Sequence, residues 1–314
     1  MFKQNFISTA LVQYLEVSAE QHGQRLDNFL LAMLKGAPRS LIYRVVRTGQ
    51  VRINKGRGQA GLRICVGDRI RIPPLRLATE KPAIRPLSND LRKLEASILY
   101  EDNKLIVLNK PAGLAVHGGS GVNYGVIEAL RVLRGQELEL VHRLDRDTSG
   151  CLMLAKRRSM LHWLHQIIQN NQLEKHYLAL LAGRMPRPKM QVDAPLRKNT
   201  LQSGERVVRV DANGKSAQTE FKRLQQFAAA TLVEVHPFSG RTHQIRVHAA
   251  HLGMPVAGDE KYGHRENNIH FKSIGLKRLF LHATTLKIPQ ADGHGSIEIT
   301  APLDPVLEEF LGKL

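Results

Sequence analysis

Short aliphatic and β-branched segments, mostly with no helix between them, fill the chain from about residue 91 onward and limit the fold that it can adopt. They are Leu105–Asn109, Leu152–Ala155, His176–Leu181, Thr231–Val235, Leu279–His282, Leu286–Ile288 and Ser296–Thr300. Helical periodicity appears at 125–133, at 159–169 and after Gly240. Because a parallel sheet needs a crossover, usually a helix, between successive strands, this order predicts an α+β fold with a large antiparallel or mixed sheet.

A proline-bearing stretch divides the chain. Residues 73–86 contain four prolines among mixed charges, and proline fixes φ and lacks a backbone donor, so this stretch is predicted to be a linker. Before it, the helical spacing of residues 26–33, a second short helix at 41–47 and two short strands predict a small α+β module. We therefore expect four parts: an N-terminal extension at 1–22, the module at 23–73, the linker at 74–90 and a large domain at 91–314.

The charge of the chain indicates a polyanionic partner. Lysine and arginine total 46 against 28 aspartate and glutamate, which gives a net charge of +18. Basic proteins gain affinity for nucleic acid because neutralising phosphates releases counterions. The excess is uneven, since residues 23–73 hold 11 basic and 2 acidic residues. We expect RNA or DNA as the partner, contacted in part by this module.

Membrane, redox and cofactor signals are weak. No apolar run approaches the roughly 18 residues needed to cross a bilayer, and polar residues interrupt the N-terminal segment, so we expect a cytoplasmic protein. Cys65 and Cys151 are too few for a disulfide framework or a zinc site. The run His117–Gly121 resembles a phosphate loop but lacks its Lys-Ser/Thr, and no histidine pair forms H-E-x-x-H. We therefore expect no nucleotide cofactor and no metal.

One face of the second helix in the module combines Ser40, Arg44 and Arg47, which recur at i, i+4 and i+7. A solvated charged face is the alternative, but further basic residues of the same module favour a surface for the RNA backbone. The candidates for RNA contact are Arg39, Ser40, Arg44, Arg47, Arg52 and Lys55. The strings at 23–27 (GQRLD) and 49–54 (GQVRIN) resemble the S4 RNA-binding domain over some 50 residues.

Two dense polar strings are the candidates for chemistry. Residues 141–150 (VHRLDRDTSG) interleave two carboxylates with two arginines, and composition alone explains them equally well as a charged surface turn. The second string, 239–248 (SGRTHQIRVH), favours a functional reading because it supplies further basic residues ahead of a predicted helix. A carboxylate beside an arginine stays ionised. An ionised aspartate is the form needed for nucleophilic attack or proton abstraction.

Several strings together resemble the pseudouridine synthases that modify ribosomal and transfer RNA. The residues 142–150 are similar to the family signature, and three other motifs follow the family order at 105–113, 174–177 and 240–246. The likeness extends from the S4-like module to Pro302. Two longer strings, 116–121 and 201–206, resemble in particular the members of the family that act on the large ribosomal subunit RNA. At position 151 the family leads us to expect an aliphatic residue, and this chain has Cys151 instead. A buried thiol fits such a position.

The resemblance implies an isomerase that breaks the N1–C1′ bond of a uridine, turns the uracil and joins C5 to C1′, with no cofactor. It implies that Asp145 is the essential carboxylate, which either attacks the sugar or abstracts a ribose proton. It implies that Arg246 pairs with Asp145, and that Tyr177 stacks on the target base. Arg143 is implied to fill the gap left by the extruded uridine, and Lys110 to support the active-site loop or to contact phosphate.

The implied partner is 23S ribosomal RNA or its assembly intermediates, contacted also by Arg241 and His243, and we expect a monomer. Three alternatives stay open. The first is the same chemistry on transfer RNA, and the second is a non-catalytic RNA-binding or assembly factor with this fold. The third is a glycoside hydrolase using Asp145 and Asp147, whose side chains would lie about 7 Å apart in an extended stretch. The basic charge and the lack of an aromatic-rich cleft speak against it.

Overall fold

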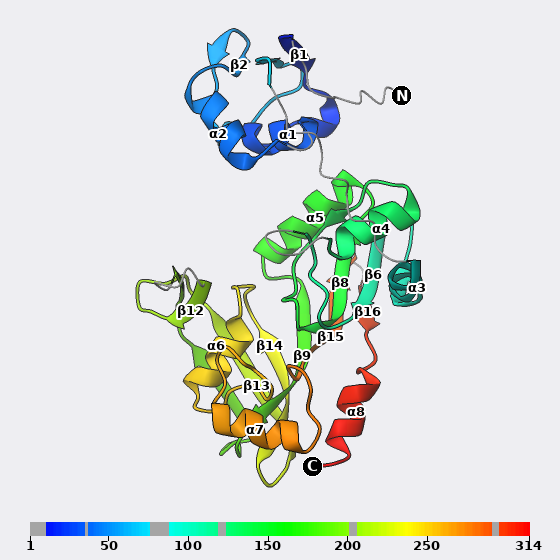
Figure 1. Ribbon diagram of the computed structural model, residues 1–314, viewed down its shortest axis with the longest axis vertical. Coiled ribbons are helices and arrows are strands. Elements are labelled where there is room, and N and C mark those ends of the chain that lie inside the picture. Colours follow the sequence, from blue (N-terminus) through cyan, green and yellow to red (C-terminus); the bar gives the residue numbers. More distant parts are fainter. Residues whose placement is uncertain (1–10, 35–36, 76–87, 119–123, 201–205, 291–294) are drawn as a thin grey trace. The chain divides into compact units, whose positions relative to one another are not determined.

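The structure of the chain is a computed structural model, and it describes residues 11–34, 37–75, 88–118, 124–200, 206–290 and 295–314. The chain forms two compact units, Met1–Ala83 and Ile84–Leu314 (Figure 1). Most of the predicted linker at 74–90 lies outside the described residues. Its last residues begin a helix, α3 (Ser88–Ala96), so the large domain starts earlier than predicted. Within the described part of the chain, no helix is long and apolar enough to cross a membrane.

The N-terminal unit combines two helices with a four-stranded antiparallel sheet. Its elements are β1 (Gln13–Glu16), the 3-10 helix η1 (Ala19–Gln21), α1 (Leu26–Met33), α2 (Arg39–Arg47), β2 (Arg52–Ile53), β3 (Gly56–Arg57) and β4 (Arg69–Ile72). The strand order is β1-β4-β2-β3, and apolar residues of both helices and of the sheet form one buried core. Because β1 pairs with β4, the predicted N-terminal extension is wrong from Gln13 onward: these residues belong to the unit.

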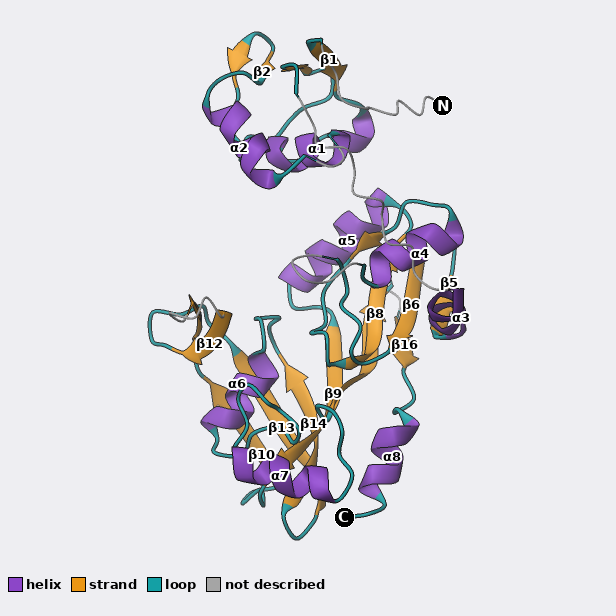
Figure 2. Ribbon diagram, in the orientation of Figure 1, coloured by secondary structure: helices purple, strands orange, loops and turns teal. Residues whose placement is uncertain are grey.

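The C-terminal unit is built on a ten-stranded mixed sheet with the order β10-β13-β14-β9-β15-β8-β6-β5, with β16 beside β15 and β7 beside β8 (Figure 2). Its strands are β5 (Ile98–Glu101), β6 (Leu105–Lys110), β7 (Glu139–Leu140), β8 (Ser149–Ala155), β9 (Glu174–Ala182), β10 (Lys189–Asp193), β13 (Gln218–Gln226), β14 (Ala230–Pro237), β15 (Leu281–Pro289) and β16 (Ser296–Thr300). A separate hairpin joins β11 (Leu196–Thr200) to β12 (Arg206–Val210). The predicted α+β fold with a mixed sheet is confirmed.

Helices cover both faces of this sheet. They are α4 (Val126–Arg134), α5 (Arg158–Gln169), α6 (Gln244–His251), α7 (Arg265–Ser273) and α8 (Pro305–Leu311). Successive strand residues point to opposite faces. On β9, Ala179 and Leu181 therefore join the core shared with α6, whereas Leu180 and Ala182 join the core shared with α7 and α8. The strands β6 and β8 divide in the same way between α4 and α5.

The two halves of the sheet meet at a short parallel pairing between β8 and β15. Only two residue pairs form it, His282 with Ser149 and Ala283 with Gly150. Gly150 has φ +108°, and a Cβ there would lie 2.2 Å from the carbonyl oxygen of Ala283. No other residue fits this close approach, because only glycine lacks the Cβ and adopts such a φ freely. The loop 141–148 enters β8 at this point.

The single strand β15 takes up all of the predicted strand Leu286–Ile288 but only the last two residues of the predicted strand Leu279–His282. The pairing of β15 with β9 shifts register between Ala283 and Thr285, so the strand continues through an irregularity that interrupts its apolar pattern.

Candidate active site

A pocket lies where the loop 141–148, strand β9 and the segment before α6 come together. Its lining includes the three residues predicted to be catalytic, Asp145, Tyr177 and Arg246. They come from the loop between β7 and β8, from β9 and from α6, three elements far apart in the sequence. Three residues predicted to contact RNA line the same pocket: Arg143, Arg241 and His243. The fold therefore brings six of the predicted site residues into one cavity.

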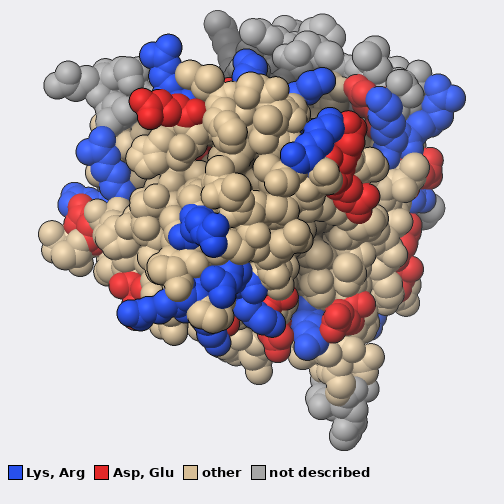
Figure 3. Space-filling view, turned by 90° about the horizontal axis from the view of Figure 1, so that it is seen from below, with Lys and Arg blue, Asp and Glu red and all other residues tan. Residues whose placement is uncertain are grey.

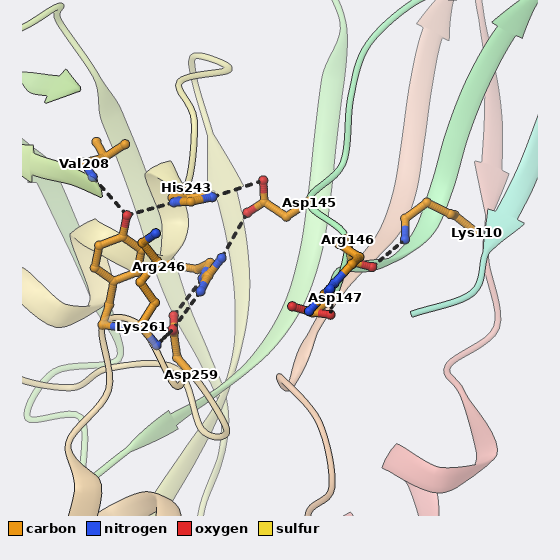
Figure 4. A network of polar contacts seen from close by, with 10 residues as sticks. Lys110, Asp145, Arg146, Asp147, Val208, His243, Arg246, Asp259 and Lys261 are labelled. Carbon is orange, nitrogen blue, oxygen red and sulfur yellow. Dashed lines mark hydrogen bonds and ion pairs between the residues drawn. The ribbon is translucent and has the colours of Figure 1, made fainter. Parts of the chain in front are cut away.

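Asp145 faces the guanidinium of Arg246, as predicted, with 3.3 Å between Nη1 and Oδ2 (Figure 4). Arg246 makes stronger contacts with a residue that the sequence reading missed. Its Nε and Nη2 each donate to one oxygen of Asp259 at 2.7 Å. The Asp259 carboxylate is fully buried and also accepts from the backbone N–H groups of Lys261 and Tyr262. This two-point contact fixes the plane of the guanidinium and leaves Nη1 directed at Asp145.

Arg246 and Asp259 each favour the charged form of the other. Burial lowers the pKa of Arg246, but the hydrogen bonds and the charge of Asp259 outweigh it, with help from Asp145, and the pKa lies above its ordinary value. Burial alone would raise the pKa of Asp259, yet the hydrogen bonds from Arg246 hold it below the ordinary value. Asp145 therefore lies beside a permanent positive charge.

His243 contacts the other oxygen of Asp145. This residue caps the N-terminus of α6 in a left-handed conformation, φ 53°, and its Nε2 lies 3.6 Å from Oδ1 of Asp145. Its Nδ1 lies 2.7 Å from the hydroxyl of Tyr262, which also accepts the N–H of Val208. This contact orients the His243 ring, with Nδ1 at Tyr262 and Nε2 towards Asp145. Burial lowers the pKa of His243, which keeps the ring neutral.

Tyr177 presents a neutral phenol to the pocket. Burial raises the pKa of its hydroxyl well above the usual value, and the nearby charge of Asp145 raises it further. The ring also packs against the apolar cores on the pocket side of the sheet. A largely buried ring with one face on a pocket is suited to stacking on a planar base.

Lys110 does not line the pocket, and its prediction as an RNA contact is wrong. The side chain is fully buried at the end of β6. Its ammonium donates to the carbonyl oxygens of Pro111 and Leu114, each at 2.8 Å, and of Arg146 at 3.0 Å. All three donor positions are used within the protein, so no phosphate reaches them. The geometry fits the other half of the prediction, support of the loop that carries Asp145.

The basic residues predicted on the N-terminal unit occupy two separate hollows. Ser40, Arg44 and Arg47 line one of them beside α2. Arg52 and Lys55 line the other, across the sheet strands. Ser40, Arg44 and Arg47 thus share one hollow, in agreement with their predicted common helix face, whereas the basic residues of β2 and the turn after it lie elsewhere on the unit. Side chains alternate along β2, and since Ile53 is buried in the core shared with the helices, Arg52 faces the opposite side. Arg39 is exposed at the start of α2.

Two strings used in the sequence reading, 116–121 and 201–206, lie largely outside the described residues. Among the described residues, no group of three or more histidine, cysteine, aspartate or glutamate side chains is arranged to hold a metal ion.

Comparison with known proteins identifies the family. Residues 104–251 match the RNA pseudouridylate synthase family, and residues 24–70 match the S4 domain. The chain is 50% identical over 304 residues to the ribosomal large subunit pseudouridine synthase C of Yersinia pestis, covering 96% of this chain and 95% of that protein. The protein of the same name from Escherichia coli strain K12 is 49% identical over 311 residues, with 98% of both chains covered.

The chain belongs to the RNA pseudouridylate synthase family. Solved structures agree with this. The human RNA pseudouridylate synthase domain containing 4 superposes with a TM-score of 0.61 at 27% identity, covering 72% of this chain and 95% of that chain. The human domain containing 1 gives 0.59 at 26% identity, covering 73% and 90%. This synthase is an isomerase that acts on RNA, and its N-terminal unit is an S4 domain.

The net charge of the synthase is not spread evenly. On the face shown in Figure 3, lysine and arginine side chains lie among acidic ones, and wide areas carry neither. By contrast, the active-site pocket is lined by four basic side chains and one carboxylate. The basic side chains are Arg143, Lys175, Arg241 and Arg246, and the carboxylate is Asp145. The pocket is therefore a local centre of positive charge suited to an anionic substrate.

Proposed function

We propose that this synthase converts specific uridines of the large ribosomal subunit RNA, the 23S RNA, into pseudouridine, with Asp145 as the catalytic residue. One observation carries the proposal: an aspartate carboxylate is paired with a buried arginine in a pocket that also presents a tyrosine ring. The names of the relatives from Yersinia pestis and Escherichia coli, which match almost the whole chain, support the choice of RNA.

In the proposed reaction, the N1–C1′ bond breaks and its electron pair leaves with the uracil. The Asp145 carboxylate either bonds to C1′ or removes a ribose proton, and both routes use the carboxylate that pairs with Arg246. The uracil turns, C5 bonds to C1′, and the proton on C5 is lost while N1 gains one. Nothing is oxidised and no group is transferred to another molecule, so we propose that the synthase works without a cofactor.

The remaining pocket residues are assigned by their positions. Tyr177 stacks on the flipped uracil and is placed to assist removal of the C5 proton, since its neutral phenol lies in the pocket with Asp145. Arg143 is exposed at the rim and fills the space that the uridine leaves in the RNA. Arg241 and His243 contact the RNA from the other side, His243 with its ring oriented by Tyr262.

The S4 domain adds affinity through phosphate contacts, which position the RNA but do not specify a sequence. Both of its hollows are lined by arginine side chains, which suits the RNA backbone. We propose that the synthase acts in the cytoplasm, as a monomer, on the 23S RNA or its assembly intermediates.

The decisive test is tritium release from C5-labelled uridine in unmodified 23S RNA. The wild-type protein is expected to release tritium, and Asp145→Asn is expected to bind the same RNA but to release none. If neither protein releases tritium from 23S RNA while both bind it, the proposed substrate is wrong. The same assay on unmodified transfer RNA then separates a transfer RNA synthase from a non-catalytic RNA-binding factor.

A further inference from the structure

One cation in the active-site pocket has no role in the arrangement described so far. Lys175 lies on β9, two residues before Tyr177, and lines the same pocket. Side chains two residues apart on a strand point to the same face at a separation of about 7 Å. Lys175 and Tyr177 therefore project into the pocket side by side, with Lys175 at the start of the strand.

The other three basic side chains in the pocket either have hydrogen-bond acceptors within the protein or are exposed to solvent. Arg246 is held by Asp259 and Asp145, Arg241 donates to the carbonyl oxygen of Ser216, and Arg143 is exposed to solvent. The ammonium of Lys175 contacts no acceptor among the described residues. It is half-buried, and its nitrogen is not among the fully enclosed atoms that lack a partner, so the nitrogen is reached from the pocket.

Within the part of the chain that the structure describes, no acidic side chain pairs with this ammonium. Burial is the only cause that lowers the pKa of Lys175, and no carboxylate raises it. Removing a charge from water without a partner costs free energy, so in the free protein this group is destabilising. Such a cost is offset when a ligand brings the opposite charge into the pocket.

The backbone opposite Lys175 leaves room for a ligand. Gly240 lies across from it, and a Cβ at that position would be 3.9 Å from the lysine nitrogen. The φ of Gly240 is not in the left-handed region, so the turn does not require glycine for its conformation. Only backbone therefore borders the ammonium on this side.

We propose that the Lys175 ammonium binds a phosphate of the RNA backbone next to the uridine in the pocket. This rests on the proposed function, which places the uracil on Tyr177 and the ribose at Asp145. The phosphates that flank a ribose are the anions nearest to it in any RNA. Among the described residues, the side-chain contacts to Asp145 come from Arg246 and His243 and not from Lys175, so a flanking phosphate is the anion available to this ammonium.

The test is single-turnover tritium release from 23S RNA, measured over a range of RNA and salt concentrations. Lys175→Met keeps the stem and removes the charge. It is expected to raise the half-saturating RNA concentration about tenfold. It is also expected to reduce the slope of log affinity against log salt by about 0.7–0.9, the loss of one phosphate contact, while the rate at saturating RNA changes little. Lys175→Arg is expected to restore most of the affinity, because arginine also binds phosphate.

The matched control is Lys313→Met, which removes an exposed lysine just after α8 that pairs with Glu309 outside the pocket. If Lys175→Met has the affinity and salt slope of this control, the proposal is wrong. It is also wrong if only the rate at saturating RNA falls, because the ammonium would then act on the uracil. A wild-type protein without tritium release would instead contradict the proposed function itself.

Thermal unfolding in the absence of RNA gives an independent readout. Since Lys175 is an unpaired half-buried charge, Lys175→Met is expected to raise the melting temperature by about 2–4 °C. A lower melting temperature would show that the ammonium has a stabilising partner within the protein, and would overturn the proposal.

Discussion

Asp259 illustrates how a single residue outside the reacting centre sets the geometry within it. Its buried carboxylate contacts Arg246 at two points, and Arg246 in turn contacts Asp145. Asp259 lies 13 residues after Arg246 and follows Gly258 in a turn. Nothing in the local pattern distinguishes it from a surface acid, so the sequence reading did not select it.

We predict that Asp259→Asn reduces the rate of tritium release at saturating RNA by about 10-fold to 100-fold, a range typical of groups that orient a functional side chain. The amide holds the guanidinium with one acceptor in place of two, and Arg246 loses its fixed orientation towards Asp145. RNA affinity is expected to change little. Asp304→Asn is the matched control, since Asp304 also pairs with an arginine, Arg278, but outside the pocket. Equal losses of rate in both variants would contradict the positioning role.

At the scale of elements, the active-site loop is attached to the sheet at both of its ends. Near its start, the N–H of Met153 on β8 donates to Nε2 of His142 at 3.1 Å, and near its end Lys110 holds the carbonyl oxygen of Arg146. Burial, helped by the charge of Lys175, lowers the pKa of His142 from 6.5 to about 3. The folded protein therefore keeps this imidazole neutral while the unfolded chain protonates it below pH 6.5.

This difference gives a stability prediction with a defined sign. Between pH 6.5 and pH 3 the unfolded chain binds more protons than the folded protein, so stability falls as the pH falls. From pH 6.5 to pH 5, His142 is expected to remove about 1.5 kcal/mol from the free energy of unfolding. Urea unfolding of the wild type, His142→Gln and the exposed control His162→Gln at both pH values measures it. An acid-induced loss in His142→Gln as large as in the wild type would assign the effect to other groups.

The elements that the sequence predicted are those with a clear apolar period. The strand β16 and the helices α4 and α5 occur where expected, because their apolar faces pack on a single core. The strand β13 was not predicted. Its sequence, QTEFKRLQQ, is polar at most positions, and it is held by neighbours on both sides, β10 and β14, rather than by its own pattern. A strand that is held by long-range pairing of this kind cannot be predicted from its local sequence pattern.

At the scale of the whole molecule, the synthase consists of a catalytic unit and an S4 domain, each with its own buried core. The motifs predicted the family, the mixed-sheet fold and the residues that meet in the pocket. They could not predict which lysine is buried and which is open, because Lys110 and Lys175 differ only in what the folded chain places around them.

Because each unit has its own core, we predict that the catalytic unit remains folded when residues 1–83 are removed. The shortened protein is expected to bind 23S RNA more weakly and with a shallower salt dependence, since phosphate contacts of the S4 domain are lost. Filter binding at several salt concentrations, together with circular dichroism of the shortened chain, measures both effects. Unchanged affinity and unchanged salt slope would exclude the S4 domain as a phosphate-binding unit.

The close approach of Gly150 to Ala283 also limits which substitutions the protein accepts at position 150. Every mutation at codon 150 that changes the amino acid adds a carbon atom 2.2 Å from the Ala283 carbonyl oxygen, at the one place where the two halves of the sheet are joined. We therefore expect every other amino acid at position 150 to destabilise the fold, whereas exposed positions away from this junction accept substitutions. Position 150 lies five residues after Asp145, so this steric restriction acts at the end of the active-site loop.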